Sequence, residues 1–376
     1  MKFLIIAGAP GSLIRFRGHL ISDLIDQGLT VHAASPDLPP DSEIRAMLEQ
    51  KGVHVHEIYL KRTGMNLVDD VRTLVDLAQL MHRVRPDYVL GYTVKPVIFG
   101  TLAGALAGCP QRFALITGLG YAFSECSENH RQRLVGGIVT HLYRQSLRHA
   151  HKVFFQNPDD QTLFRQLGML NGTTPSVVVN GSGVDIEHYA PRDYPGRVTF
   201  VLISRLLIDK GVREYVEAAY RLKEAFPEAS FLLVGGLDSN PRAITLQELD
   251  RWVADGVITY LGKLDDVREA LATASVFVLP SFYREGIPRT ILEALAMGRP
   301  VITTDTPGCR ETVVDGENGY LVPPRDADRL ASAMCKFLEN PELAIGMGKR
   351  AREAAMKKFD VRLVNAVMLK EMGISC

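Results

Sequence analysis

Two glutamates and the residues around them form the part of the sequence best suited to bind a polar ligand. Glu285 and Glu293 stand eight positions apart, and Gly286 and Pro288 follow closely on an apolar run at 276–280. This order predicts a strand, a loop and a helix whose first N–H groups suit an anion. A carboxylate within such a helix can accept hydrogen bonds from two hydroxyl groups. An isolated pair of this kind is better explained as surface charge that compensates a helix dipole.

A basic pair is the second candidate for chemistry. Arg205 and Lys210 lie in the run SRLLIDKG at 204–211, directly after an apolar run that predicts a strand. Cations at such a position can bind the phosphate oxygens of a ligand, and they would stabilise negative charge that develops there during a reaction. A lone pair with this spacing is better explained as the solvated start of a helix, but its place between a strand and a helix favours diphosphate binding.

The elements that must position these residues alternate along the whole chain. Short β-branched runs are separated by segments of helical periodicity, which is typical of α/β folds with parallel sheets and crossover helices. The segment 190–196 (APRDYPG) divides two such series, because its two prolines and its glycine cannot continue a helix or a central strand. We therefore expect domains over 1–190 and 196–355, and a helix over 356–376 that caps the second domain or crosses back onto the first. The predicted strands lie at 2–8, 30–35, 53–60, 88–93, 112–117, 152–156, 176–179, 198–204, 230–235, 257–262, 275–280 and 300–304.

Length, composition and charge exclude several classes of protein. The 376 residues fit two domains, and 46% hydrophobic residues argue against a disordered chain. Lys plus Arg equals Asp plus Glu at 43 each, so the protein has no net positive charge that would attract nucleic acid. Five scattered cysteines without metal-ligand spacing favour a reducing cytoplasm. The longest apolar stretch, 88–109, contains Lys95 and Pro96, and it predicts a strand and a buried helix rather than a membrane span.

The motifs around the two glutamates carry a resemblance to a known family. From Pro280 to Glu311 the elements P-S, E-G-x-P, E-A-x-A-x-G-x-P-V and T-D-x-P-G-x-x-E occur in one order. This order resembles the nucleotide-sugar site of retaining glycosyltransferases with the GT-B fold, the large family-four group with two glutamates separated by seven residues. The resemblance is specific from Ser204 to Glu311 and looser before Gly181. It implies two Rossmann-like, doubly wound domains that face each other across a cleft, an acceptor-binding domain followed by a nucleotide-sugar-binding domain.

The resemblance also implies roles for individual residues. Glu285 would face the hydroxyls of the donor sugar, and Glu293 would bind the ribose diol. Arg205 and Lys210 match the basic pair of the family, so we expect Glu285, Arg205 and Lys210 to be the catalytic residues. Taken alone, the glycines at 11, 235 and 262 are equally well explained as ordinary turn or strand-ending residues. The residues expected to contact the nucleotide sugar are Glu293, Gly11, Gly235, Gly262, Gly286, Ile287, Pro288 and Thr290.

The first half of the chain departs from the family in one loop. Many members carry a histidine near the reacting sugar, and the loop at 116–123 (ITGLGYAF) has none. This loop, with QNPDD at 156–160 and NGSGVD at 180–185, instead resembles a bacterial subgroup. Its members extend undecaprenyl-diphosphate-linked sugars, often with a UDP-N-acetylhexosamine such as UDP-GalNAc. The residues expected to contact the acceptor are Arg15, Arg17, Thr117 and Tyr121.

Two further patterns concern membranes and metals. The segment 112–152 carries six Lys or Arg residues against two Glu, so it fits either an anionic lipid surface or a solvated helix face. Asp326 and Asp328 spell the D-x-D pattern that binds metal in another glycosyltransferase fold. Here they follow two prolines, so we interpret Asp326 as a helix N-cap and Asp328 as a first-turn charge. We expect no metal, because Arg205 and Lys210 can neutralise the diphosphate.

Together these patterns predict a retaining glycosyltransferase. It would move a hexose or N-acetylhexosamine, best GalNAc or a related sugar from a UDP donor, onto a lipid-diphosphate-linked saccharide in bacterial glycan or O-antigen assembly. It would need no cofactor, and it would work in the cytoplasm, in contact with the anionic inner face of the membrane. The alternative is a UDP-sugar 2-epimerase of the same fold, which would need no acceptor.

Overall fold

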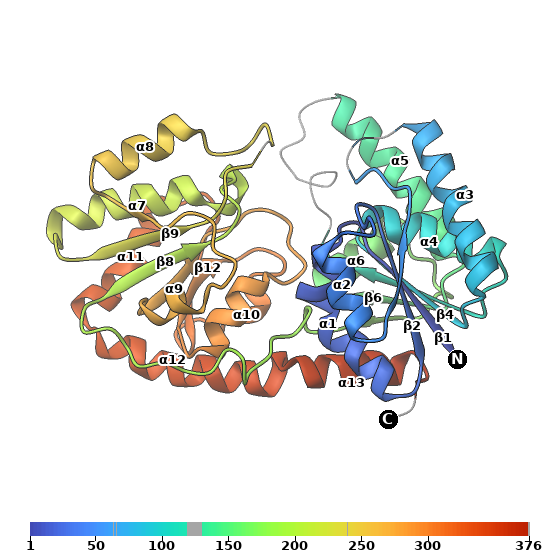
Figure 1. Cartoon of the computed structure of the whole chain (residues 1–376). Coiled ribbons are helices and arrows are strands. Elements are labelled where there is room, and N and C mark those ends of the chain that lie inside the picture. The colour runs from blue at the N-terminus through green and yellow to red at the C-terminus, as the bar shows by residue number, and fades with distance from the viewer. Residues whose placement is uncertain (63, 65, 119–129, 239, 375–376) are drawn as a thin grey trace. The chain divides into compact units, whose positions relative to one another are not determined.

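The computed structural model describes residues 1–62, 64, 66–118, 130–238 and 240–374, with only the backbone at 130–134. The chain forms two compact units (Figure 1). The first unit comprises Met1–Ser182 and Arg362–Cys376, and the second comprises Gly183–Val361. The chain therefore passes from one unit to the other twice, after Ser182 and after Val361.

The first unit is built on a seven-stranded parallel sheet in the order β3-β2-β1-β4-β5-β6-β7. Its strands are rich in apolar residues because helices cover both faces of the sheet (Figure 1). One face packs against α1, α2 and α13, and the other against α3, α4, α5 and α6. The strands are β1 Lys2–Ile6, β2 Thr30–Ser35, β3 His54–Glu57, β4 Tyr88–Tyr92, β5 Gln111–Ile116, β6 Lys152–Phe155 and β7 Ser176–Val178; the helices are α1 Gly11–Asp26, α2 Glu43–Gln50, α3 Leu67–Val84, α4 Val94–Leu106, α5 His130–Leu147, α6 Pro158–Gln166 and α13 Val361–Glu371.

The second unit repeats this plan with a six-stranded parallel sheet in the order β10-β9-β8-β11-β12-β13. In both units the order reverses beside the first strand, and ligands of such sheets bind at the carboxyl ends of the strands near that point. The strands are β8 Thr199–Ile203, β9 Ser230–Val234, β10 Thr259–Tyr260, β11 Val276–Leu279, β12 Val301–Thr304 and β13 Gly319–Val322; the helical segments are η2 Ile208–Lys210, α7 Val212–Ala225, α8 Leu246–Ala254, α9 Arg268–Ala272, α10 Arg289–Ala296, η3 Arg310–Thr312, α11 Ala327–Glu339, α12 Glu342–Ala354 and the π-helical turn η4 Ala355–Phe359.

The predicted fold class is confirmed: both units are Rossmann-like parallel α/β structures. Each predicted strand overlaps an observed one, although β3 and β10 are shorter than the runs that predicted them. The sequence analysis did not predict β13, which pairs with β12 at the edge of the second sheet.

The boundary between the units lies before the proline-containing segment 190–196, which was expected to separate them. Val184 is fully buried in the core of the second unit and forms a bridge with Asp360. The Tyr194 hydroxyl donates to the carbonyl of Ala344 at 2.8 Å and also to that of Gly298. The segment is thus irregular in backbone but packed onto the second unit. At the other end, α13 belongs to the first unit, where its apolar side chains join the core beneath α1.

Candidate active site

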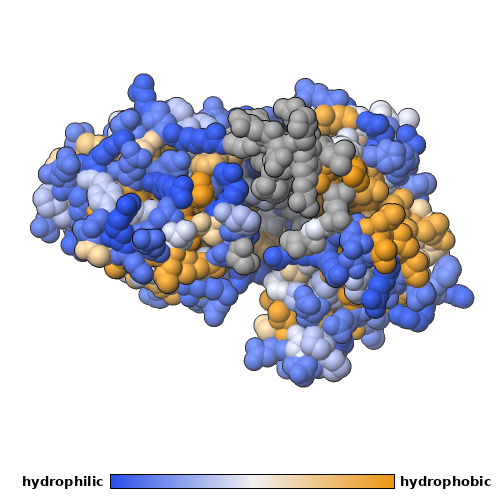
Figure 2. All heavy atoms as spheres, turned by 90° about the horizontal axis from the view of Figure 1, so that it is seen from above, coloured by the Kyte–Doolittle hydropathy of each residue, from blue (hydrophilic) through white to orange (hydrophobic). Residues whose placement is uncertain are grey.

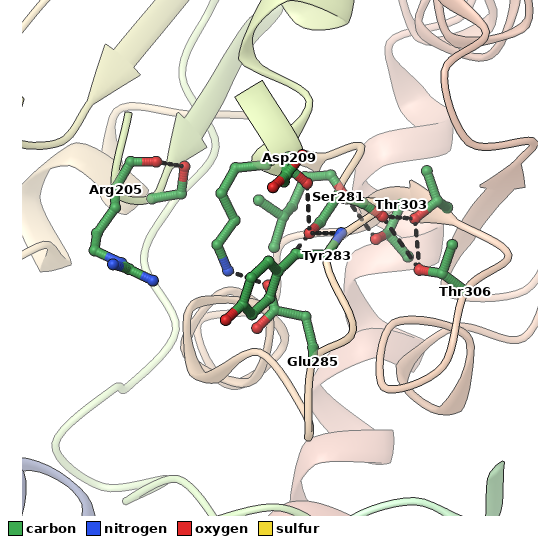
Figure 3. A network of polar contacts seen from close by, with 11 residues as sticks. Arg205, Asp209, Ser281, Tyr283, Glu285, Thr303 and Thr306 are labelled. Atoms are coloured by element: carbon green, nitrogen blue, oxygen red, sulfur yellow. Dashed lines mark hydrogen bonds and ion pairs between the residues drawn. The ribbon is translucent and has the colours of Figure 1, made fainter. Parts of the chain in front are cut away.

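Three loops meet at the carboxyl ends of β8, β11 and β12 in the second unit (Figure 3). Their backbones touch at two glycines with positive φ. A Cβ on Gly211 would lie 2.1 Å from the carbonyl oxygen of Pro280, and one on Gly308 would lie 2.2 Å from that of Gly286. Since no side chain fits at these distances and left-handed φ values favour glycine, the close contact of the loops depends on both residues.

Asp209 joins the β8 loop to the β11 loop. Its carbonyl oxygen accepts hydrogen bonds from the N–H groups of Phe282 at 2.9 Å and Tyr283 at 3.0 Å, and from the Ser281 hydroxyl at 3.3 Å. Its side chain is almost buried and accepts a hydrogen bond from Arg242 Nε at 2.9 Å. The sequence analysis assigned no role to Asp209, although it lies beside Lys210 in the quoted run.

Lys210 and Glu285, two of the predicted catalytic residues, form an ion pair at this junction. Their side chains are only 12% and 13% exposed. The same carboxylate oxygen of Glu285 accepts from the Ser281 hydroxyl at 3.2 Å, and Lys210 Nζ lies 5.2 Å from the centre of the Tyr283 ring. The pair places one cation and one hydrogen-bond acceptor side by side, which suits a ligand that carries both an anion and hydroxyl groups.

Arg205, the third predicted catalytic residue, lies on the same loop but apart from this pair (Figure 3). Its guanidinium pairs with Asp238 at 3.2 Å, and its side chain is 54% exposed. The structure therefore gives the two cations of the basic pair different surroundings: Lys210 is enclosed, whereas Arg205 faces solvent.

Glu293 lies in the second turn of α10 and is 6% exposed. One of its oxygens, Oε1, accepts hydrogen bonds from the Tyr189 hydroxyl at 2.9 Å and from Arg289 Nε at 2.8 Å. The guanidinium offsets the cost of burying the carboxylate. Tyr189 was not identified from sequence, because it precedes Glu293 by 104 positions and no local pattern joins them.

The end of β12 supports the β11 loop through three threonines (Figure 3). Thr303 donates to the carbonyl of Leu279 at 2.7 Å, while Thr304 and Thr306 both donate to that of Ser281, the latter at 3.1 Å. These hydroxyls belong to the T-T-D-T-P part of the motif and were not predicted to have a role.

A buried thiol lies next to these threonines. Burial, and secondly the charge of Glu285, raise the pKa of Cys309 to about 11. The thiol is therefore protonated at neutral pH and acts as a small apolar side chain of the core.

The other residues predicted to contact the nucleotide sugar in the second unit form two groups, one at the start of α10 and one at the ends of β9 and β10. Gly286, Ile287 and Pro288 are buried where the β11 loop enters α10, with Thr290 half-buried in the first turn of the helix.

The two strand-ending glycines differ in what surrounds them. A Cβ on Gly235 would lie 1.9 Å from the carbonyl oxygen of Ser204, so contact between the β8 and β9 loops already explains this glycine. Around Gly262, by contrast, a Cβ would meet no described atom within 4 Å.

The residues predicted for the first unit are spread over two strand ends. Gly11 begins α1 and is exposed, as is Arg15. Arg17 is 1% exposed, with its guanidinium carbon 5.3 Å from the centre of the Tyr92 ring. Thr117 is half-buried just after β5, and Tyr121 lies outside the described residues.

Three cations of the basic segment at 112–152 make contacts within the first unit. Arg112 Nε donates to the carbonyl of His149 at 2.7 Å, and Arg144 Nε donates to that of Gly168 at 2.8 Å. Lys152 pairs with Glu371 at 2.6 Å. These cations stabilise the packing of their own elements, and the charge of Lys152 is balanced by Glu371.

The D-x-D pattern has the local role that its context predicted. Asp326 is the N-cap of α11 and accepts from the N–H of Arg329 at 2.8 Å. Asp328 lies in the first turn and pairs with Arg221 at 2.5 Å. Within the described ranges, no group of three or more His, Cys, Asp or Glu side chains is placed to hold a metal ion.

Curated proteins resemble most of the chain. A Campylobacter jejuni protein is 29% identical and covers 98% of both chains; it is named N,N'-diacetylbacillosaminyl-diphospho-undecaprenol alpha-1,3-N-acetylgalactosaminyltransferase. An Escherichia coli protein is 25% identical over 79% of this chain and 78% of its own; it is named UDP-Gal:alpha-D-GlcNAc-diphosphoundecaprenol alpha-1,3-galactosyltransferase.

Solved structures and family models agree with these relatives. Anabaena HepE, crystallised in complex with UDP, superposes with a TM-score of 0.77 at 21% identity over 99% of this chain and 100% of its own, a likeness that supports the GT-B fold. Residues 12–157 match the model of the glycosyl transferase 4-like family, and residues 197–340 match that of the glycosyl transferases of group 1. These two segments make up most of the chain, which therefore belongs to the GT-B glycosyltransferases of these two family models.

Proposed function

We propose that the chain transfers an N-acetylhexosamine or hexose from a UDP-sugar to a lipid-diphosphate-linked saccharide in bacterial glycan assembly. The observation that carries the proposal is the junction of Lys210, Glu285 and α10 at the strand ends of the second unit. The substrate classes follow the printed names of the two relatives, both of which name diphosphoundecaprenol. Among donors, UDP-GalNAc is the first choice, because the full-length relative is named an N-acetylgalactosaminyltransferase.

In this proposal, different side chains bind the diphosphate, the sugar and the ribose of the donor. Lys210 and Arg205 bind the diphosphate, and the enclosed position of Lys210 strengthens its attraction to the phosphate oxygens. Glu285 accepts from the sugar hydroxyls, and Glu293 from the ribose. Lys210 and Arg205 are the two cations of the β8 loop, and we propose that they bind the diphosphate in place of a metal.

We propose further that the anomeric configuration of the donor is retained. The reason is the resemblance of the Glu285 and Glu293 motif to retaining transferases. Glu285 forms an ion pair with Lys210. Because this pair holds the carboxylate in place, a hydrogen-bonding role is favoured over that of a nucleophile. We therefore expect front-side substitution assisted by the leaving diphosphate.

Product analysis by mass spectrometry tests the proposal. Purified protein is incubated with EDTA, a panel of UDP- and GDP-sugars, and a polyprenyl-diphosphate-linked N-acetylhexosamine. A mass gain of one sugar on the acceptor identifies a metal-independent transferase and its donor, and proton NMR of the new linkage gives its anomeric configuration. A C2-epimerised free sugar nucleotide without acceptor product would contradict transfer and indicate the epimerase alternative.

We also propose that the first unit contacts an anionic membrane through α3. No described helix is long and apolar enough to cross a bilayer. Apolar side chains gather on the surface of the first unit (Figure 2), and on α3 they include Leu67 and Val68, which are 79% and 75% exposed. Val71 and Val75 continue this exposed face at 51% and 48%.

The charges of α3 support this orientation. Its acidic side chains are turned toward neighbouring elements: Asp69 pairs with Lys61 at 2.9 Å, and Asp70 pairs with Lys95 at 2.8 Å. The apolar face therefore carries little negative charge that an anionic lipid surface would repel.

A vesicle-binding measurement tests the role of α3. We expect Val68→Glu combined with Val71→Glu to reduce flotation with phosphatidylglycerol vesicles severalfold. The matched control is Leu106→Glu, which alters a 68% exposed apolar residue on α4. Equal binding of the α3 variant and the wild type would contradict the assignment.

A further inference from the structure

Tyr189 contacts the carboxylate that the proposed function assigns to the ribose. It lies in the first segment of the second unit, six positions after Gly183, and is 8% exposed. Its hydroxyl donates to Glu293 Oε1 at 2.9 Å. Burial, and secondly the charge of Glu293, raise the pKa of Tyr189, so the phenol keeps the proton that it donates.

The two oxygens of Glu293 are used differently. Oε1 accepts from both Tyr189 and Arg289, and two donors occupy the two lone pairs of a carboxylate oxygen. Oε2 accepts no hydrogen bond from any residue that the structure describes. Because the donors come from separate segments, they fix the rotation of the carboxylate as well as its position, and they keep Oε2 available for a ligand.

The backbone around Tyr189 is itself held in place. Arg352 Nη1, on α12, donates to the carbonyls of Ile186 at 2.9 Å, Tyr189 at 3.2 Å and Ala296 at 2.6 Å. Ala296 is the last residue of α10, the helix that carries Glu293. One guanidinium thus connects the Tyr189 turn to this helix, so that the phenol and the carboxylate are positioned by the same contact.

We propose that Tyr189 is a positioning residue for Glu293, and that it directs Oε2 toward the ribose hydroxyls of the donor. This inference rests on the proposed function, since it requires a nucleotide ligand. It extends that function by naming a residue, outside the recognised motifs, that sets the discrimination between a ribose and a sugar without its hydroxyls. Removal of the phenol oxygen leaves Oε1 with one donor, and the carboxylate can then rotate.

The test compares two ligands by titration calorimetry. UDP and 2′,3′-dideoxy-UDP differ only in the hydroxyls that Glu293 would bind, so the ratio of their Kd values measures that contact. We expect wild-type protein to prefer UDP by about 10-fold or more, the effect of one or two hydrogen bonds to a charged group. Tyr189→Phe should reduce this preference at least about threefold, mainly through weaker binding of UDP.

Tyr194→Phe is the matched control. Tyr194 lies on the same segment, but its hydroxyl donates to the carbonyls of Gly298 and Ala344. This variant should melt at a lower temperature than the wild type and keep the full preference for UDP. A purely structural role of Tyr189 would weaken the binding of both ligands equally, and that result would overturn the inference.

The remaining outcomes separate the inference from the function on which it rests. If wild-type protein binds UDP with no preference over the dideoxy compound, the inference is wrong and the transferase proposal still stands. If wild-type protein binds neither compound, while the same preparation transfers no sugar from UDP donors, the proposed function fails and the inference fails with it. If Tyr189→Phe keeps the wild-type ratio, only the positioning role is refuted.

Discussion

The two units share a strand order but differ in how their strand ends are tied. In the second unit, the loops after β8 and β11 are bonded to each other through the carbonyl of Asp209 and the close contact at Gly211. In the first unit, the turn after β1 leads directly into α1 and meets β4 through the Ser12 and Tyr92 hydroxyls, 2.7 Å apart. Backbone contacts therefore preform the proposed donor site, whereas recognition in the first unit depends on side chains at separate strand ends.

Loss of the enclosed cation should have the largest effect. We expect Lys210→Ala to lower kcat by about 100-fold or more, the range found when one donor to a developing negative charge is removed. In the first unit, Arg15→Ala should raise only the KM for the acceptor, because Arg15 is exposed. Steady-state kinetics with both substrates varied measures the two effects. A Lys210 variant with near wild-type turnover would refute its role and the contrast between the units.

Loss of the buried carboxylate should come next. Glu293→Ala removes the proposed ribose contact, so donor affinity should fall about 10- to 100-fold, while the KM for the acceptor changes little. Calorimetry with UDP measures the first effect and acceptor kinetics the second. Unchanged affinity for UDP would exclude Glu293 from the donor site. Because Tyr189 and Arg289 lose their acceptor, a lower melting temperature should accompany the change.

The sequence predicted those features that depend on local pattern. Buried parallel strands such as 199–203 are continuous apolar runs, so their positions were clear. Lys210 and Glu285 were recognised because each follows such a run and lies in a motif. β13 was missed, because a four-residue run that begins with Gly319 and closely follows Gly316 has the pattern of a turn.

Contacts between distant segments could not be predicted, because they produce no local pattern in the sequence. Asp209 and Arg242 are 33 positions apart, and Tyr189 and Glu293 are 104 apart. Nothing in the spacing of these residues indicates that they meet, because the fold alone brings their elements together. The segment 190–196 was misleading for the same reason. Its prolines indicate an irregular backbone, but not the tertiary contacts of Tyr194 that attach it to the second unit.

Two glycines, one in each unit, test whether the contact between the loops of the second unit is tightly constrained. Gly211 and Gly28 both have φ near 75°, but a Cβ would meet the backbone only at Gly211. Gly28→Ala should therefore cost about 1 kcal/mol for the left-handed conformation alone. Gly211→Ala should cost about 1–3 kcal/mol more, because the junction of the loops must open. Urea unfolding of both variants measures the difference, and equal losses would show that the loop contact is not tightly constrained.

The smallest expected effect is a dependence on pH that arises in the first unit. His32 stacks on His54 and His56, and its Nδ1 lies 2.9 Å from His56 Nε2. Burial, followed by the neighbouring His56, His54 and Lys2, lowers the pKa of His32 from 6.5 to about 4. The unfolded chain then binds a proton that the folded chain rejects, so stability falls as the pH drops below 6.5, and this loss is complete below about 4.

His32→Phe keeps an aromatic ring between its neighbours and removes the titrating group. Its melting temperature should fall less steeply than that of the wild type between pH 6.5 and about 4. His56 will retain part of the dependence, because burial lowers its pKa as well. Parallel slopes for the two proteins would show that His32 does not carry the acid sensitivity. The contrast between the two units would then rest on their strand-end loops, because the titration of His32 would add nothing to it.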